Sequence, residues 1–355
     1  MMRVKLKDIT NYSKGSQINR DILLENGKYI YLNGGINPSG KWNAYNVSSK
    51  TITISEGGNS SGYINYITEP FWCGAHCYYL FDGPKNTKYL YYALKSQQER
   101  LFKIRSGACM PNIKKKDLGN FEFEFDFNEK IQIKIVSILD ECNKIINNYK
   151  LELELLDELV KARFVELFGD PATNEYNWPM LNLENVSSII TYGLTVRPTY
   201  VNKGIDLISA RELHKGFIEY EVAPKISFND FQSLSDKGKP LKNDILFSKT
   251  GSIGHCALVD TDKMFAITQN AARLGLIIEK VNPVWLLYYL RMNYIQDWCK
   301  RHAKGNAVKD LQLKDIKAIP LFECPLELQN QFADFVKEVD KSRFIIKSMI
   351  KEGLL

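Results

Sequence analysis

Hydrophobic positions recur with helical spacing in two long segments of the chain, at about 129–168 and 327–352. Apolar side chains alternate between steps of four and three residues, the heptad pattern of helices that pack along a seam. Most apolar positions of the first segment lie 197 residues before an apolar position of the second segment. Ser342 interrupts the pattern in the second segment. We expect the seams to pack on each other or on a partner helix, although amphipathic helices of an ordinary bundle would give a similar pattern. The predicted partner-binding positions are Ile131, Ile135, Ile138, Ile145, Tyr149, Leu328, Phe332, Phe335, Val339 and Ile346.

The segments that precede these helices have a different pattern. The stretch FEFEFDF, from Phe121 to Phe127, alternates strictly and predicts a strand with one buried face. Dense turn sequences such as NGG, SEGGNSSG and KTGSIG predict short strands joined by tight turns. One helix is expected near 86–104 and another near 282–302. The first long helix, about 60 Å at 1.5 Å per residue, should end at FGDP, where glycine and proline stop helices.

The chain also repeats itself in order. GACMPNIKKKDL, which begins at Gly107, has a counterpart in GNAVKDLQLKDI, which begins at Gly305. Similar weak pairs are VKLKDI with LNLENV, TITISEGGNSSGYI with NDILFSKTGSIGHC, and KYLYYALKS with VWLLYYLRM. Because the matches are collinear, they indicate a duplicated unit of about 180 residues. We predict an α+β chain of two mixed α/β lobes, at 1–128 and 171–326, separated by long antiparallel coiled-coil helices at 129–170 and 327–355.

Bulk composition places the chain among ordinary globular proteins. It has 355 residues, of which 45% are hydrophobic and 25% charged, enough for about two domains with buried cores. An odd count of seven cysteines fits a reducing compartment. The N-terminal MMRVKLKDIT lacks the apolar run of a signal peptide, and no apolar window is long enough for a membrane span. We expect a cytoplasmic protein.

The positive charge is concentrated in the lobes. Residues 1–128 hold 17 basic and 11 acidic side chains, and residues 169–326 hold 19 and 17. The helical segment 129–168 has six basic and eight acidic residues, and 327–352 has five of each. This is the distribution expected if the lobes contact phosphates and the helices contact protein.

No catalytic or metal-binding motif emerges from the sequence. GINPSGKW, from Gly35 to Trp42, has the glycines and lysine of a P-loop, but the indole stands where a magnesium-ligating hydroxyl is needed. We interpret it as a turn whose aromatic tip faces DNA. CGAHC, at residues 73–77, lacks the second ligand pair of a zinc site. Motifs of serine hydrolases, zinc proteases and dinucleotide-binding folds are absent, so we expect no catalysis, no metal and no cofactor on this chain.

Several motifs resemble a known family over essentially the whole chain. They are LKDI (6–9), DILFSKTGSIG (244–254), the Gln-Asn of FAITQNAARL (265–274), GNAVKDLQLKDIKAIPLF (305–322) and PLELQNQFADFVKEVD (325–340). Together with the two lobes and two heptad helices, they resemble the specificity subunit of type I restriction-modification enzymes. The second helix is nearly a third shorter than the first, which departs from an even pair.

The resemblance implies a function. Each lobe would be a target recognition domain that reads one half of a bipartite, asymmetric site in double-stranded DNA. The helices would set the distance between half-sites and bind two methyltransferase subunits, which methylate adenine with S-adenosylmethionine. Motor-nuclease restriction subunits would join this complex. The alternatives are a general nucleic-acid-binding scaffold without a methyltransferase partner, and a nuclease whose site the sequence does not show.

Reading bases requires long polar side chains and aromatics on turns over a rigid sheet. The candidates for DNA binding in the first lobe are Lys14, Gln17, Asn19, Arg20, Asn33, Asn37, Lys41, Trp42, Asn43, Asn59, Ser60 and Tyr63. Those in the second lobe are Arg197, Arg211, His214, Lys249, Thr250, Ser252, His255, Gln269, Asn270 and Arg273.

Overall fold

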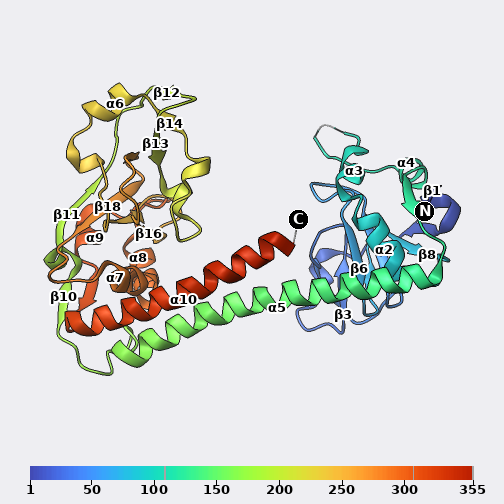
Figure 1. Ribbon diagram of the computed structural model, residues 1–355, viewed down its shortest axis with the longest axis horizontal. Helices are drawn as coiled ribbons and strands as arrows, with labels where there is room; N and C mark the ends of the chain where they lie inside the picture. Colours follow the sequence, from blue (N-terminus) through green and yellow to red (C-terminus); the bar gives the residue numbers. More distant parts are fainter. Residues whose placement is uncertain (108, 307, 354–355) are drawn as a thin grey trace. The chain divides into compact units, whose positions relative to one another are not determined.

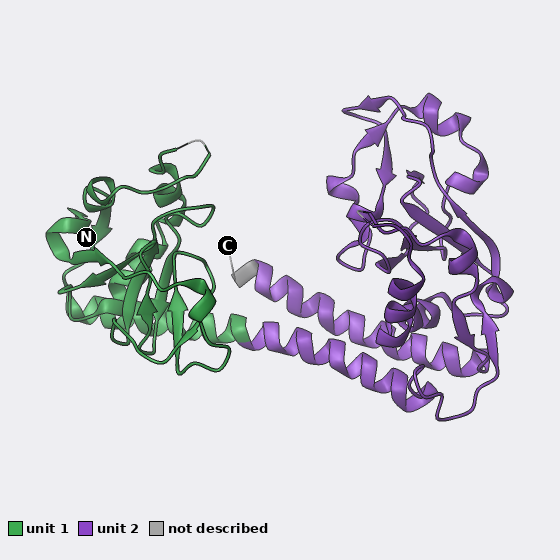
Figure 2. Cartoon of the chain, turned by 180° about the vertical axis from the view of Figure 1, so that it is seen from behind, with its two compact units in different colours: residues 1–147 green, residues 148–355 purple. Residues whose placement is uncertain are grey.

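The computed structural model describes residues 1–107, 109–306 and 308–353 of the chain (Figure 1). It divides into two compact units, residues 1–147 and 148–355 (Figure 2). The 40-residue helix α5, Glu129–Phe168, contributes its first half to unit 1 and its second half to unit 2. Each unit is therefore one lobe together with part of the long helix.

Unit 1 is built on two sheets and a short ribbon. A four-stranded antiparallel sheet has the order β2-β8-β5-β6, and a three-stranded sheet has the order β4-β3-β7, in which β3 pairs with β7 in parallel. The ribbon pairs β1 with β9. The strands are β1 Met2–Lys5, β2 Asn11–Lys14, β3 Tyr29–Leu32, β4 Gly40–Trp42, β5 Thr51–Ser55, β6 Ile64–Ile67, β7 Trp72–Cys73, β8 Cys77–Phe81 and β9 Glu122–Phe125. The helices before α5 are α1 Leu6–Ile9, η1 Arg20–Ile22, α2 Thr87–Lys95, α3 Gln98–Lys103 and α4 Lys115–Gly119.

Unit 2 repeats this plan. Its sheets have the orders β11-β18-β15-β16 and β12-β14-β13-β17, with β13 and β17 parallel, and its ribbon pairs β10 with β19. The strands are β10 Met180–Asn182, β11 Ser187–Tyr192, β12 Tyr200–Val201, β13 Ile205–Ile208, β14 Lys225–Ile226, β15 Ile245–Ser248, β16 Cys256–Leu258, β17 Phe265–Ile267, β18 Ala271–Leu276 and β19 Pro320–Phe322. The helices are η2 Leu183–Val186, η3 Ala210–Leu213, η4 Tyr220–Val222, α6 Phe228–Ser233, η5 Asp236–Gly238, α7 Pro283–Arg291, α8 Asn293–His302, α9 Leu313–Lys317 and α10 Leu326–Gly353.

The shared strand orders confirm the duplicated α+β fold that the sequence predicts. The additional strand β12 and helix α6 belong to unit 2 (Figure 1). Equivalent core positions are occupied by similar side chains, because both lobes bury the same helix faces. Leu90 and Leu94 of α2 correspond to Leu286 and Leu290 of α7, and all four are fully buried.

Strand β9 shows how the alternating pattern acts. Phe123 and Phe125 point into the core of unit 1 and are almost completely buried, while the intervening Glu124 is exposed. A strand directs successive side chains to opposite faces, so the FEFEF part of the motif places its rings on the core side. Phe127 lies beyond the end of β9 and is 54% exposed, so the strand is shorter than the predicted Phe121–Phe127. The ribbon β1–β9 then leads directly into α5.

Each predicted lobe helix is in fact two helices. Asn86 and Asn282 cap the starts of α2 and α7 with their side-chain oxygens. In unit 2 the break falls at Met292, whose ψ of 141° is extended. The Gln296 side chain donates to the Leu290 carbonyl at 2.7 Å, which satisfies an acceptor that the end of α7 leaves free.

Within unit 2, α10 packs antiparallel on the second half of α5. Phe332 contacts Phe164 with ring centroids 5.3 Å apart, whereas Arg343, further along α10, binds Asp157, which lies earlier on α5. Val339 is also buried in this unit. Among residues 1–107, 109–306 and 308–353, no helix combines the length and apolar character needed to cross a membrane.

The predicted seam needs two corrections. On α5 the buried stripe is Val160, Phe164 and Phe168, whereas Leu159, at which the heptad series of the sequence continues, is exposed. The stripe advances by four residues because α5 contacts α7 as well as α10: Phe164 stacks on Trp285, 6.3 Å away. The second-helix positions Leu328, Phe332, Phe335, Val339 and Ile346 are buried or half-buried in the chain, so they hold the fold rather than present a surface for another subunit.

Candidate nucleic-acid interface

In unit 1, the glycine-rich turn after β5 is bonded to the loop between α3 and α4. The Gly58 N–H donates to the Pro111 carbonyl at 2.9 Å, and the Ile113 N–H donates to the Glu56 carbonyl at 2.9 Å. Asn112 closes the loop through a pair of backbone bonds with Ser106, both 2.8 Å. We call residues 56–58 with 109–113 the first rim.

Unit 2 forms the same structure. The Gly251 N–H donates to the Lys309 carbonyl at 2.9 Å, and the Leu311 N–H donates to the Lys249 carbonyl at 2.8 Å. Asp310 pairs with Lys304 as Asn112 pairs with Ser106. We call residues 249–251 with 308–311 the second rim. The motif GACMPNIKKKDL and its repeat therefore supply one side of each rim.

Beside the first rim lies a cluster of polar side chains that includes three of the predicted DNA-binding residues. Lys14 donates to the Glu56 carboxylate, and the His76 Nδ1 lies 3.4 Å from the same carboxylate. Asn33 accepts from the His76 N–H at 3.2 Å and donates to Gln17 at 3.2 Å. The sequence analysis missed the two residues at its centre, Glu56 and His76, although both lie in motifs that it quoted.

At the second rim, Lys249 and Thr250 both donate to the carboxylate of Asp310. Burial alone would raise the pKa of Asp310, but these two bonds lower it below its ordinary value. The Lys249 side chain is only 12% exposed. The Lys249 ammonium is therefore already paired with a carboxylate, so this predicted DNA-binding residue is not a free cation.

Two histidines of the predicted set lie near this rim. Burial lowers the pKa of His255 first, and the nearby His214 lowers it further, so the pKa shift favours the neutral ring. His214 is exposed and its Nδ1 lies 2.8 Å from the Arg211 carbonyl. Arg211 itself extends from η3 and is exposed.

Arg273 is not part of any surface, contrary to the prediction. It lies in β18 with 7% of its surface exposed. Its Nε donates to Asp244 at 2.6 Å, and its guanidinium also donates to the Asp236 carbonyl at 2.7 Å. A buried guanidinium needs a paired carboxylate, so this arginine serves the interior of the lobe.

The other predicted residues are either exposed or occupied by contacts within their own lobe. Exposed in unit 1 are Asn19, Arg20, Asn37, Lys41, Asn43 and Asn59, and in unit 2 Arg197, Ser252, Gln269 and Asn270. Ser60 donates to the Gly34 carbonyl at 2.7 Å, and the Tyr63 ring lies under the Lys95 ammonium, 3.9 Å from its centroid. Trp42 ends strand β4 and is half-buried, so GINPSGKW leads into a strand rather than an exposed aromatic tip.

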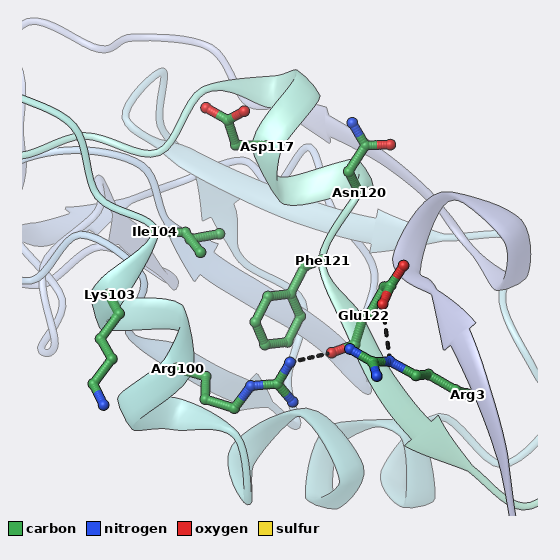
Figure 3. Close-up of a pocket in the computed structure, with 8 residues that line it drawn as sticks. All are labelled: Arg3, Arg100, Lys103, Ile104, Asp117, Asn120, Phe121 and Glu122. Carbon is green, nitrogen blue, oxygen red and sulfur yellow. Dashed lines mark hydrogen bonds and ion pairs between the residues drawn. The ribbon is translucent and has the colours of Figure 1, made fainter.

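Elsewhere in unit 1, α3, α4 and β9 surround an open pocket of about 500 Å³ (Figure 3). Arg100 spans it, donating to the Glu122 carbonyl at 3.0 Å, and Arg3 binds the Glu122 carboxylate at 2.8 Å. Lys103 and Asp117 also line it. Because cations and carboxylates are mixed here and none of the predicted DNA-binding residues lines the pocket, we assign it no ligand.

The two cysteines of the CGAHC segment have a structural role. Cys73 and Cys77 are buried in the smaller core of unit 1, whereas the His76 side chain points toward Glu56. Across the described part of the chain, His, Cys, Asp and Glu side chains nowhere gather in threes to hold a metal ion.

Helix α5 presents a different surface in unit 1. Ile135 and Val136 pack on the core of the lobe, and Asp140 accepts from Lys88 at 2.7 Å and from Tyr92 at 2.5 Å. These contacts fix which face of α5 the lobe covers. The remaining predicted seam positions of this half, Ile131, Ile138 and Ile145, are exposed, and Tyr149, just beyond it, is half-buried.

The comparisons with known proteins match this arrangement. The family model "Type I restriction modification DNA specificity domain" matches residues 1–156 and 196–355. The chain belongs to this family. The first matched segment covers the first lobe and most of α5, and the second begins after β11 and covers the rest of the second lobe with α10.

Relatives of this family include a putative type I specificity subunit of Mycoplasma genitalium, 29% identical over 191 residues, which are 53% of this chain and 50% of the relative. One from Mycoplasma pneumoniae is 32% identical over 163 residues, 44% of this chain and 40% of the relative. The chain thus spans about half the length, or less, of the curated relatives it matches. The fold extends further: a crystal structure of a type I S subunit from M. genitalium covers 99% of this chain and 92% of its own, with a TM-score of 0.62 and 20% identity.

Proposed function

We propose that this chain is the DNA-specificity subunit of a type I restriction-modification complex. In this proposal each lobe reads one half of a bipartite, asymmetric site in double-stranded DNA. The observation that carries it is the duplication of the rim. Each lobe has the same pair of loops at the equivalent place of its own four-stranded sheet. This is expected if two copies of one DNA-binding domain contact two stretches of DNA.

Family membership and charge support the proposal. The family is named for DNA specificity, and the excess of basic residues falls in the lobes. Exposed asparagine, glutamine and arginine side chains can form paired hydrogen bonds with base edges, whereas phosphate contacts carry no sequence information. In the described residues, Asn59 and Ser252 are exposed next to Gly58 and Gly251 of the rims, so they are the first candidates for base contacts.

The proposal assigns protein partners to the helices. Ile131, Ile138 and Ile145 form an exposed apolar stripe on the half of α5 that lies in unit 1. Such a stripe at heptad spacing is suited to helices of another subunit. We assign it to the methyltransferase subunits, two per complex, which would carry S-adenosylmethionine and methylate adenine. The restriction subunits would join this assembly, and the chain itself would recognise DNA without catalysing a reaction.

Expression with a methyltransferase gene from the same restriction system, followed by sequencing of methylated bases, tests this function. The expected result is one bipartite motif with methylated adenines in both halves, present only when this chain is expressed. Copurification of nucleic acid without any methylated motif would support a general nucleic-acid scaffold instead. Cleavage of DNA by the purified chain with magnesium would contradict the non-catalytic assignment.

A further inference from the structure

The two rims share an exposed apolar side chain at the same position. Met110 in the first rim is 76% exposed, and Val308 in the second is 61% exposed. They occupy the same place in the repeat, 198 residues apart, two positions before Asn112 and Asp310, which close the two loops. A single exposed hydrophobic residue is ordinary, but exposure at the same place in both copies suggests a shared role.

The loops behind these side chains are held firmly. Met110 is followed by Pro111, whose carbonyl accepts from Gly58, and by Asn112, which is bonded through its backbone and side chain to Ser106. In the second rim, Val308 precedes Lys309, whose carbonyl accepts from Gly251. Each apolar side chain therefore projects from a braced turn. Insertion into a structured target favours such bracing because less conformational entropy is lost.

The glycines next to these side chains leave room for a close approach. Gly58 and Gly251 have φ values of +76° and +80°, which explains their identity by backbone conformation. Gly57 has no such φ, and a Cβ built on it would meet no atom within 4 Å. Neither packing nor backbone strain requires a glycine at that position. In the first rim this bare backbone suits a ligand that approaches closely, whereas the second rim has Thr250 at the equivalent place.

The charged neighbourhood favours a polyanion as this ligand. Lys114, Lys115 and Lys116 follow the first rim in sequence, and Lys304 and Lys309 frame the second. All five of these lysines are exposed. An apolar tip flanked by lysines combines the two features of proteins that insert a side chain between base pairs while they hold the phosphates on either side.

We propose that Met110 and Val308 are DNA wedges, one in each half-site. Each side chain would enter the stack at one base step of its half-site, partly separate the two base pairs and kink the duplex. The inference rests on the proposed function, since it assumes that the lobes bind double-stranded DNA. It adds a contribution to specificity that needs no base-edge contact, because the energy required to unstack a step depends on its sequence.

The test uses the full chain in complex with its methyltransferase and a duplex carrying the methylated motif. A fluorescent base analogue, 2-aminopurine, replaces one base at a time, excluding the methylated adenines because a methyltransferase can flip its target base. We expect fluorescence to rise at one step of each half-site. Met110→Ala should abolish the rise in the half read by the first lobe only, and Val308→Ala in the other half only. Affinity should fall about tenfold in each case.

Matched variants separate a wedge from other roles. Met110→Leu should keep the fluorescence rise, because an apolar side chain of similar volume still separates the bases. Val196→Ala, which truncates the same residue type at an exposed site of the second lobe, should change neither signal. The salt dependence of binding should be identical in all variants, since none changes a charge.

The possible outcomes distinguish a failure of the wedge proposal from a failure of the proposed function. Specific binding by the wild-type complex with no fluorescence rise in either half-site would overturn the wedges and leave the proposed function intact. Failure of the wild-type complex to bind the motif specifically would overturn the proposed function itself. If Met110→Ala or Val308→Ala weakened assembly with the methyltransferase in the absence of DNA, these side chains would be protein contacts, and the inference would be wrong.

Discussion

Arg343 of α10 donates to Asp157 of α5 at 2.6 Å and to the adjacent Leu156 carbonyl at 3.3 Å. It also donates to the Tyr288 hydroxyl of α7 at 3.3 Å, so one guanidinium joins three helices of unit 2. Burial alone would lower the pKa of Arg343, but its bonds to Tyr288 and Asp340 raise it above the ordinary arginine value. The contact fixes both the antiparallel direction and the register of the helix pair.

Replacing this guanidinium should loosen α10. Arg343→Ala removes the bonds to Asp157, the Leu156 carbonyl and the Tyr288 hydroxyl, and we expect a loss of about 1–3 kcal/mol of local stability. Hydrogen exchange of the α10 amides measures it. Lys341→Ala is the matched control, because Lys341 forms an exposed pair with Glu338 in the same helix, and such pairs contribute little. Equal protection in the two variants would show that Arg343 does not hold the helices.

The aromatic centre of the helix pair should contribute more. Phe332 is fully buried against Phe164, Phe168 and Tyr288. Phe332→Ala should cost about 3–5 kcal/mol because a cavity remains. Urea unfolding followed at α10 measures the cost. Phe344→Ala removes an equal ring that is 73% exposed on the same helix, and it should stay within about 0.5 kcal/mol of wild type.

The second rim should loosen in acid. The bonds from Lys249 and Thr250 hold the pKa of Asp310 below its ordinary value of 3.8. A depressed pKa in the folded state stabilises the rim above pH 3.8, and this stabilisation disappears as the pH falls through the lower folded value. Asp310→Asn should therefore be less stable than wild type near pH 6 and approach it in stability as the pH falls below the lowered pKa of Asp310. A stability difference that is independent of pH would rule out the ion pair as its source.

Two arginines of the second lobe should behave in opposite ways. Arg211 is exposed on η3, and Arg211→Ala should relax one position of the recognised motif at a cost of about 1–3 kcal/mol in binding, with folding unchanged. Arg273 is buried with Asp244, and Arg273→Ala should destabilise the lobe by about 3–5 kcal/mol, because it leaves a buried carboxylate unpaired. Binding to matched and mismatched duplexes, with unfolding curves for both variants, separates the roles. If Arg273→Ala folded normally and changed the base preference, Arg273 would be a DNA-binding residue and its assignment to the interior would be wrong.

The sequence predicts the large features of the fold because they depend on periodic patterns. The alternation of FEFEFDF determines which face of β9 is buried, and helix α5 spans the predicted 129–168. The break between α7 and α8 escaped prediction because Met292 is apolar and continues the helical pattern. At this break, the Gln296 side chain donates to the Leu290 carbonyl in place of a backbone N–H. A pattern of apolar positions does not predict such a side-chain bond.

The candidate site is less predictable, since exposure of a polar side chain is decided by its partner. Arg273 follows a run of small apolar residues in FAITQNAARL, and its burial depends on Asp244, 29 positions earlier. Lys249 is likewise paired by Asp310, 61 positions later. Neither partner has a local signature. Glu56 and His76 are central to the first cluster for the same reason, because the fold brings together a turn after β5 and a turn before β8.

The central claim is that the lobes are independent readers of two DNA half-sites, and exchange of one lobe tests it most directly. Residues 1–128 would be replaced by the equivalent lobe of a relative with a different target, and α5 and unit 2 would be kept. Sequencing of methylated bases in cells that express the chimera with its methyltransferase gives the motif. The account predicts that one half changes while the other half and the spacer length are retained. A motif altered in both halves, or in neither half of an active complex, would contradict it.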